Sequence, residues 1–430
     1  MEELLQKLKE AHAKKMSKYI MPIIHNKYQL DQLLAAVSNM WMVQNVTKDK
    51  IVLKRVKSTK DIVNAQQLLE SLKNLETVNK YFSPNNSTFM CQLSKTQKRS
   101  KAMGGGAQGK VVWYPDWRMD VVIKTTTPSP EDAASVALSG EYDLFEAPVN
   151  GVYKTDVSKV EVLTASMMNE LAHGDGHSFS LFIPRFTAFY ACPALHIVTE
   201  VIPNGTMRDT LNAFRVTGLQ YDKVRELKVL MFQAIYTMIS INKLGYVHQD
   251  SRPENFLVKN INDDEEYNGQ NIGSASHWTL KMNDRSWKLP NVKKIAKLTD
   301  FGFTIRPKSP YATEGPFIEL EITYTEDDVV YQQFEPGFRV LNEFRIGADV
   351  GHFLLMAMYR MPVELVHELL ESLVPFWDIK QPLTEVAHYL TTRPDMTQFA
   401  TDKWRTSPHL DNVDYTDLLD SAFFEDLFMD

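Results

Sequence analysis

The stretch Tyr246-Val-His-Gln-Asp-Ser-Arg-Pro-Glu-Asn-Phe-Leu-Val258 decides how this chain folds and what it does. It follows a long helical pattern and leads into a short apolar run, so it is predicted to form a tight loop between a helix and a strand. The loop carries Asp250, a cation at Arg252 and an amide at Asn255. These groups suit accepting a hydroxyl proton, neutralising a phosphoryl group and holding a metal ion.

Three further segments carry matching chemistry. Leu298-Thr-Asp-Phe-Gly-Phe303 places an aspartate between an apolar run and a glycine, where its carboxylate can bind Mg²⁺. Upstream, the glycine-rich segment 103–111 lets the backbone approach phosphate oxygens closely. Val121-Val-Ile-Lys124 ends a β-branched run with a lysine, which needs an anionic partner because an unpaired buried ammonium is costly.

In this order and spacing, the four segments resemble the signature of the eukaryotic-type protein kinase superfamily. The Asp250-to-Asn255 segment resembles the Ser/Thr rather than the Tyr kinases, and the divergence outside the motifs resembles kinases of large DNA viruses. The resemblance covers about residues 100–405. It implies transfer of the γ-phosphoryl group of Mg-ATP to Ser/Thr hydroxyls of protein substrates.

The resemblance also implies a role for each matching residue. Asp250 would be the catalytic base, Arg252 the cation on the γ-phosphate, and Asn255 with Asp300 the ligands of Mg²⁺, or of Mn²⁺ in its place. The nucleotide-binding residues would be Gly104, Gly106, Gly109, Val111, Lys124, Thr199, Glu200 and Ile202, with Thr199 as the gatekeeper.

Two other positions follow from the resemblance. Lys124 would pair with a glutamate, and the sequence leaves Glu161 and Glu170 open for this role, with Glu161 preferred. Asp349 would open the helix that anchors the catalytic loop, and Thr392-Arg-Pro394 resembles the arginine that braces the activation segment. No clear motif closes that segment; Glu335-Pro336 and Glu343 are the candidates.

The fold class is predicted as α+β, a bilobal protein-kinase-like fold with a small β-rich N-lobe and a larger helical C-lobe. Residues 1–95 are predicted to form a helical extension, with apolar stripes that include Leu8, Trp41 and Leu69. The N-lobe is placed at 96–202, the C-lobe at 203–405 with an insertion at about 260–292, and an amphipathic tail at 406–430.

Charge is distributed unevenly along the chain. Residues 1–100 hold 17 Lys and Arg against 8 Asp and Glu, whereas residues 411–430 hold six Asp, one Glu and no basic residue. The helical spacing of its apolar residues favours docking of the tail on a groove of this chain or of a partner, with the basic head as one hypothesis. A disordered, solvated tail is the alternative. Nucleic-acid binding by the head is a less favoured hypothesis, since a solvated basic face is commoner.

Two cysteines and no secretory signal or membrane-length apolar run favour an intracellular protein without a membrane role, cytoplasmic or nuclear, in the host cell if the source is viral. Two rival functions stay open, a pseudokinase or nucleotide-binding scaffold and a small-molecule kinase. Gln249 stands where the family usually has an arginine that pairs with an activation-loop phosphate. We therefore expect activity without phosphorylation of that loop.

Overall fold

The computed structural model divides the chain into two compact units. Unit 1 comprises residues 1–142 and 185–201, and unit 2 comprises residues 143–184 and 202–430. The structure describes residues 2–22, 41–46, 50–55, 101–106, 109–113, 121–126, 150–155, 157–173, 181–191, 195–217, 220–267, 270–320, 342–377, 379, 381–392 and 413–428. Helices and strands are both well represented among them, in agreement with the predicted α+β class.

Unit 1 is built around a five-stranded antiparallel sheet with the order β4-β5-β6-β9-β8. Its strands are β4 (Lys101–Gly106), β5 (Gly109–Trp113), β6 (Val121–Thr126), β8 (Phe186–Ala191) and β9 (Leu195–Glu200). The β-branched runs in β5, β6 and β9 favour this pleated structure. Ile123, Ile197 and Val198 are each 2% exposed and belong to its core.

The N-terminal part of unit 1 differs from the helical extension predicted for it. Helix α1 (Glu2–Ala13) is confirmed and buries Leu8. The strands β1 (Lys18–Pro22), β2 (Trp41–Val46) and β3 (Lys50–Arg55) follow, forming an antiparallel sheet in the order β1-β3-β2. The helical prediction is therefore wrong for Trp41, because short runs such as Ile51-Val-Leu53 pair more favourably across strands than along a helix. The predicted stripe around Leu69 lies outside the described residues.

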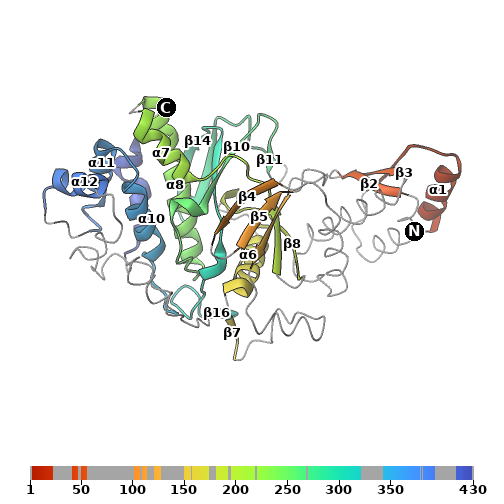
Figure 1. Ribbon diagram of the computed structural model, residues 1–430, viewed down its shortest axis with the longest axis horizontal. Coiled ribbons are helices and arrows are strands. Elements are labelled where there is room, and N and C mark those ends of the chain that lie inside the picture. Colours follow the sequence, from red (N-terminus) through yellow and green to blue (C-terminus); the bar gives the residue numbers. More distant parts are fainter. Residues whose placement is uncertain are drawn as a thin grey trace. The chain divides into compact units, whose positions relative to one another are not determined.

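Unit 2 is mainly helical (Figure 1). Its helices are α6 (Val157–His173), α7 (Met207–Thr217), α8 (Tyr221–Lys243), α10 (Ala348–Met358), α11 (Val363–Leu373), α12 (Leu383–Thr392) and α14 (Ala422–Glu425), with short 3₁₀ turns η2 (Pro253–Asn255), η3 (Phe301–Phe303) and η5 (Tyr415–Asp420). Every residue of α8 from Leu227 to Asn242 is buried. This all-round burial exceeds the broad apolar face that the sequence predicted, because α7, α10, β15, η5 and α14 all pack on α8.

Among its described residues, unit 2 also contains four small two-stranded ladders. The strands are β7 (Val152–Thr155), β10 (Phe256–Asn260), β11 (Glu266–Tyr267), β12 (Gln270–Asn271), β13 (His277–Met282), β14 (Arg285–Pro290), β15 (Lys294–Leu298) and β16 (Phe317–Leu320). β10 pairs with β15, β11 with β12, and β13 with β14, each antiparallel, while β7 and β16 are parallel. The two hairpins β11–β12 and β13–β14 occupy the segment predicted as an insertion. Over the described residues, none of the helices has the length and apolar character needed to cross a membrane.

Candidate functional site

Pairing of β10 with β15 builds the base of the site. In this antiparallel ladder Phe256, the first residue of β10, lies opposite Leu298, the last residue of β15. Asn255 and Thr299 are therefore adjacent, and the Thr299 amide donates a 2.8 Å hydrogen bond to the Asn255 carbonyl. This register brings Asp300 beside the loop that holds Asp250, although the two are fifty positions apart in the sequence.

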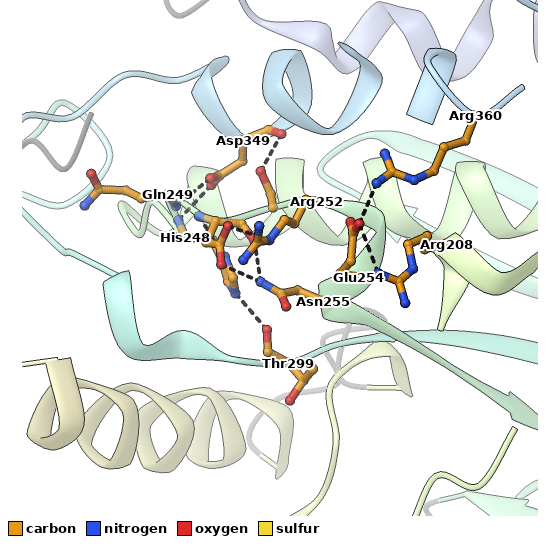
Figure 2. A network of polar contacts seen from close by, with 11 residues as sticks. Arg208, His248, Gln249, Arg252, Glu254, Asn255, Thr299, Asp349 and Arg360 are labelled. Carbon is orange, nitrogen blue, oxygen red and sulfur yellow. Dashed lines mark hydrogen bonds and ion pairs between the residues drawn. The ribbon is translucent and has the colours of Figure 1, made fainter. Parts of the chain in front are cut away.

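The loop that follows α8 surrounds Asp250 with Asn255 and Arg252, which are labelled in Figure 2. The Asn255 side chain donates from Nδ2 to both the backbone oxygen and Oδ2 of Asp250, at 2.8 Å each. Arg252 Nε lies 3.1 Å from Asp250 Oδ1 as an ion pair. Oδ1 accepts no hydrogen bond of good geometry from the described residues. One carboxylate oxygen is thus fixed by Asn255, and the other is buried beside the Arg252 guanidinium without a hydrogen bond of good geometry.

His248 links this loop to the segment around Asp300. Its Nε2 is 3.0 Å from the Thr299 carbonyl, and its Nδ1 is 3.3 Å from the backbone N–H of Asp250. A carbonyl only accepts and an N–H only donates, so these contacts assign the neutral tautomer with the proton on Nε2. The Phe301 ring packs edge-on against the imidazole, with 5.2 Å between centroids. His248 therefore holds the two motifs together rather than facing a substrate.

The buried Asp349, at the start of α10, anchors the loop from the opposite side (Figure 2). Its carboxylate accepts hydrogen bonds from the backbone N–H groups of His248 and Gln249 at 2.8 Å each, and from Asn242 Nδ2 at 2.9 Å. Ser251 Oγ donates to its backbone oxygen at 2.7 Å. The predicted anchoring role of Asp349 is confirmed.

Burial, the largest effect, raises the pKa of Asp250, and the nearby Arg252 guanidinium only partly opposes this. The negative charge of Asp300 also raises the pKa of Asp250, so the two carboxylates are close enough to repel each other. A raised pKa makes Asp250 a stronger proton acceptor once it is ionised.

The oxygens of Asn255 and Asp300 fit a hard divalent cation. Because Asn255 Nδ2 is committed to Asp250, its remaining polar atom is the carbonyl oxygen Oδ1, which is a suitable ligand for Mg²⁺. Asp300 adopts the left-handed conformation with φ 65° and ψ 63°, uncommon outside glycine and asparagine or aspartate. Over the described residues no cluster of three or more His, Cys, Asp or Glu could hold a metal by itself.

An ion cluster beside the loop was not predicted from the sequence. Glu254 Oε1 accepts a 2.6 Å bond from Arg360 Nη2, and Arg208 Nη1 lies 3.8 Å away (Figure 2). Arg360 follows α10 and Arg208 belongs to α7, so the cluster ties the loop to two helices. No local sequence pattern indicates such partners, because they are 46 and 106 positions from Glu254.

The predicted nucleotide-binding residues of unit 1 lie on its five-stranded sheet. Gly104 and Gly106 on β4 and Gly109 on β5 flank the connection between these strands. Val111 on β5 lies opposite Lys124 on β6. Thr199 on β9 lies opposite Val122, which precedes Lys124 by two residues on β6. Residues opposite each other share a face, as do residues two apart on a strand. Val111, Lys124 and Thr199 therefore share one face of the sheet, which the sequence alone could not establish.

The remaining predicted residues are distributed over both units. Glu200 ends β9, where its Oε1 accepts a 2.9 Å bond from the Arg185 amide, and Ile202 is a buried residue of unit 2. Glu161 and Glu170 both lie on α6, nine positions apart. The Glu161 side chain is only 6% exposed. Helix α6 packs on η3, next to Asp300.

Some predicted features of the activation segment lie outside the described residues. Among them are Arg393-Pro394, just after the end of α12, and Glu335-Pro336. Glu343 is described and lies on the surface, 3.4 Å from Arg345.

Comparison with known proteins gives one partial similarity. A probable serine/threonine-protein kinase from Dictyostelium discoideum is 32% identical over 88 residues. The match covers 20% of this chain and 6% of that protein. No family model matches the chain. The comparison thus hints at a kinase relationship over a fifth of the sequence.

Proposed function

We propose that the chain is an ATP-dependent protein kinase that transfers the γ-phosphoryl group of Mg-ATP to Ser/Thr hydroxyls of protein substrates, with unit 1 and unit 2 as the two lobes of a kinase-like fold. The observation that carries this proposal is the Asp250 carboxylate, with one oxygen fixed by Asn255 and the other free of a good hydrogen bond beside Arg252. The partial similarity to a probable Ser/Thr kinase agrees with it.

In the proposed reaction, the acceptor hydroxyl oxygen forms a bond to the γ-phosphorus, and the bond from that phosphorus to the bridging oxygen of ADP breaks. The hydroxyl proton passes to Asp250 Oδ1. The Arg252 guanidinium neutralises negative charge on the transferred group. Asn255 and Asp300 would hold Mg²⁺, which supplies charge neutralisation on the phosphates.

Unit 1 would bind the nucleotide. The shared face of Val111, Lys124 and Thr199 supports a surface on which a purine and its phosphates lie, with the β4–β5 glycines over the phosphates. Glu161 is the proposed partner of Lys124, since it is buried and a buried carboxylate needs a compensating charge. Glu170, also on α6, is the alternative partner.

Transfer of radiolabelled phosphate from ATP to a mixed protein acceptor in the presence of Mg²⁺ tests the proposal. We expect transfer by the intact chain and its loss in Asp250→Asn and in Lys124→Met, with both variants still folded by circular dichroism. Nucleotide binding without transfer by the intact chain would instead indicate a pseudokinase. Labelling of a sugar or nucleoside acceptor, with none of protein, would indicate a small-molecule kinase.

A further inference from the structure

The C-terminal segment 413–428 is attached to unit 2 along the length of α8. Four of its acidic side chains pair with basic ones: Asp414 with Lys243, Asp417 and Asp420 with Arg285, and Asp426 with Lys228. Lys228 and Lys243 are 15 residues apart on α8, which corresponds to about 22 Å of helix. The segment therefore runs antiparallel to α8. These contacts lie on α8 and the β13–β14 hairpin of this chain.

Large buried side chains fix the segment in place. Tyr415, Leu418, Leu419, Phe423 and Phe424 are each at most 1% exposed. The Tyr415 hydroxyl accepts a 2.7 Å bond from Trp377 Nε1, and the Phe424 ring packs edge-on against Phe232 of α8 with 5.3 Å between centroids. Such burial makes the segment part of the core of unit 2.

The buried side chains of the segment hold Asp414 next to Lys243. Its Oδ1 accepts the Thr416 amide at 3.0 Å, while Oδ2 pairs with Lys243 Nζ. Burial by itself would raise the pKa of Asp414, but the hydrogen bonds from Lys243 and Thr416 outweigh it and lower the pKa. Asp414 is thus held as a carboxylate at neutral pH.

The other side of Lys243 faces the segment that follows Asp300. Lys243 Nζ lies 5.2 Å from the centroid of the Tyr311 ring, a cation–π geometry. Tyr311 belongs to a turn in which Ser309 and Ala312 exchange backbone hydrogen bonds at 3.1 and 3.2 Å. Two residues after Lys243, a Cβ on Gly245 would lie 2.2 Å from Ala312 Cβ, so the turn rests directly on the end of α8.

We infer that Asp414 is a positioning residue for the proposed reaction: through Lys243 it fixes the turn 309–312 that follows Asp300. The expected effect of Asp414 on phosphoryl transfer rests on the proposed function. The coupling of Asp414 to the turn 309–312 does not depend on it. The turn contains none of the proposed nucleotide-binding residues. Tyr311 of this turn is 42% exposed, so a bound protein can reach it. We therefore place the effect of Asp414 on the use of the protein acceptor rather than on ATP.

Three variants of the full-length chain test this inference. Asp414→Asn keeps an acceptor for the Thr416 amide but removes the charge that holds Lys243. Asp414→Glu restores the charge. Asp417→Asn is the matched control, since it removes one charge from the same segment, from a carboxylate that pairs with Arg285 on the hairpin and not with Lys243.

Hydrogen exchange and steady-state kinetics are measured on each variant. In Asp414→Asn we expect the Ser309 and Ala312 amides to exchange about two- to fivefold faster, the size expected for losing a partly exposed ion pair. We expect the KM for a protein acceptor to rise by a similar factor, with the KM for ATP unchanged. Asp414→Glu should recover most of both effects, and Asp417→Asn should show neither.

The outcomes separate the two proposals. Unchanged exchange at Ser309 and Ala312 in Asp414→Asn overturns the inference, as does an equal acceleration in Asp417→Asn. Faster exchange in Asp414→Asn with an unchanged acceptor KM overturns its catalytic part. If the Ser309 and Ala312 amides exchange faster in Asp414→Asn but the intact chain transfers no phosphate, the coupling between Asp414 and the turn is supported and the proposed function is wrong.

Discussion

Replacing Asp349 with alanine tests whether one buried carboxylate holds the catalytic loop. The substitution removes the acceptor of three hydrogen bonds, from the amides of His248 and Gln249 and from Asn242 Nδ2, at 2.8 to 2.9 Å. Asp349 is 1% exposed, so water cannot readily replace the lost acceptor. The Ser251 contact survives, because it is made to the backbone oxygen of residue 349.

The magnitude follows from the number and burial of these bonds. A hydrogen bond to a charged group contributes about 1.5–3 kcal/mol, and three of them would give a simple sum of roughly 4.5–9 kcal/mol. Local relaxation lowers this, and removing one partner of a buried charged network typically costs about 3–5 kcal/mol. We therefore expect Asp349→Ala to lower the free energy of unfolding by about 3–5 kcal/mol, a large part of a typical domain's stability.

Asp209→Ala is the matched control, because Asp209 also accepts two bonds near a helix start but is exposed. Its Oδ2 accepts the Thr206 amide at 2.9 Å and the Thr206 hydroxyl at 2.8 Å, forming a cap for α7. Loss of such a cap costs about 1 kcal/mol. Urea unfolding followed by tryptophan fluorescence compares the two variants. A loss below about 1 kcal/mol for Asp349→Ala, with an unchanged dependence on urea, would refute the anchoring argument.

Four further outcomes are expected. Asp250→Asn should abolish transfer and raise the thermal unfolding midpoint at neutral pH. The pKa of Asp250 is raised in the folded protein, so its ionised carboxylate destabilises the fold at any pH above its pKa in the unfolded chain. A lower midpoint would contradict this. For the same reason, transfer by the intact chain should rise with pH as Asp250 loses its proton, and a rate that falls over that range would argue against Asp250 as the base. Phosphatase treatment should leave transfer unchanged, because Gln249 Nε2 donates to the Phe303 carbonyl at 3.0 Å and needs no phosphate; loss of activity would count against this. Gly245→Ala should cost about 2 kcal/mol or more in urea unfolding, since φ is +84° and the added Cβ meets Ala312.

The sequence predicted those parts of the site that depend on short spacing. Asp250, Arg252 and Asn255 lie within one turn-containing loop, so their proximity follows from five residues of chain. Asp349 was also predicted, because the resemblance to a family links the start of that helix to the loop. Asp300 required the register of β10 with β15, which sequence patterns favour but do not fix.

Contacts between distant segments were not predictable in the same way. The pairing of Glu254 with Arg360 and the path of the C-terminal segment both depend on how helices pack, and many charged residues on their surfaces are equivalent in local pattern. The strands of residues 18–55 were missed for a related reason. Short apolar runs fit either periodicity, and pairing with a partner strand decides between them.

The hydrogen bonds of the loop determine what chemistry it can offer. Both ring nitrogens of His248 and both N–H bonds that Asn255 Nδ2 can supply are used within the protein, so neither residue has a nitrogen left for substrate. What the loop retains is oxygen: Asp250 Oδ1 and Asn255 Oδ1, with the Arg252 cation beside the first. Oxygens of this kind accept protons and bind hard cations, and they are poorly suited to holding an anion. An anionic group bound at this loop would therefore have to contact Arg252 or a bound cation rather than these oxygens, which is the reason for including Mg²⁺ in the proposal.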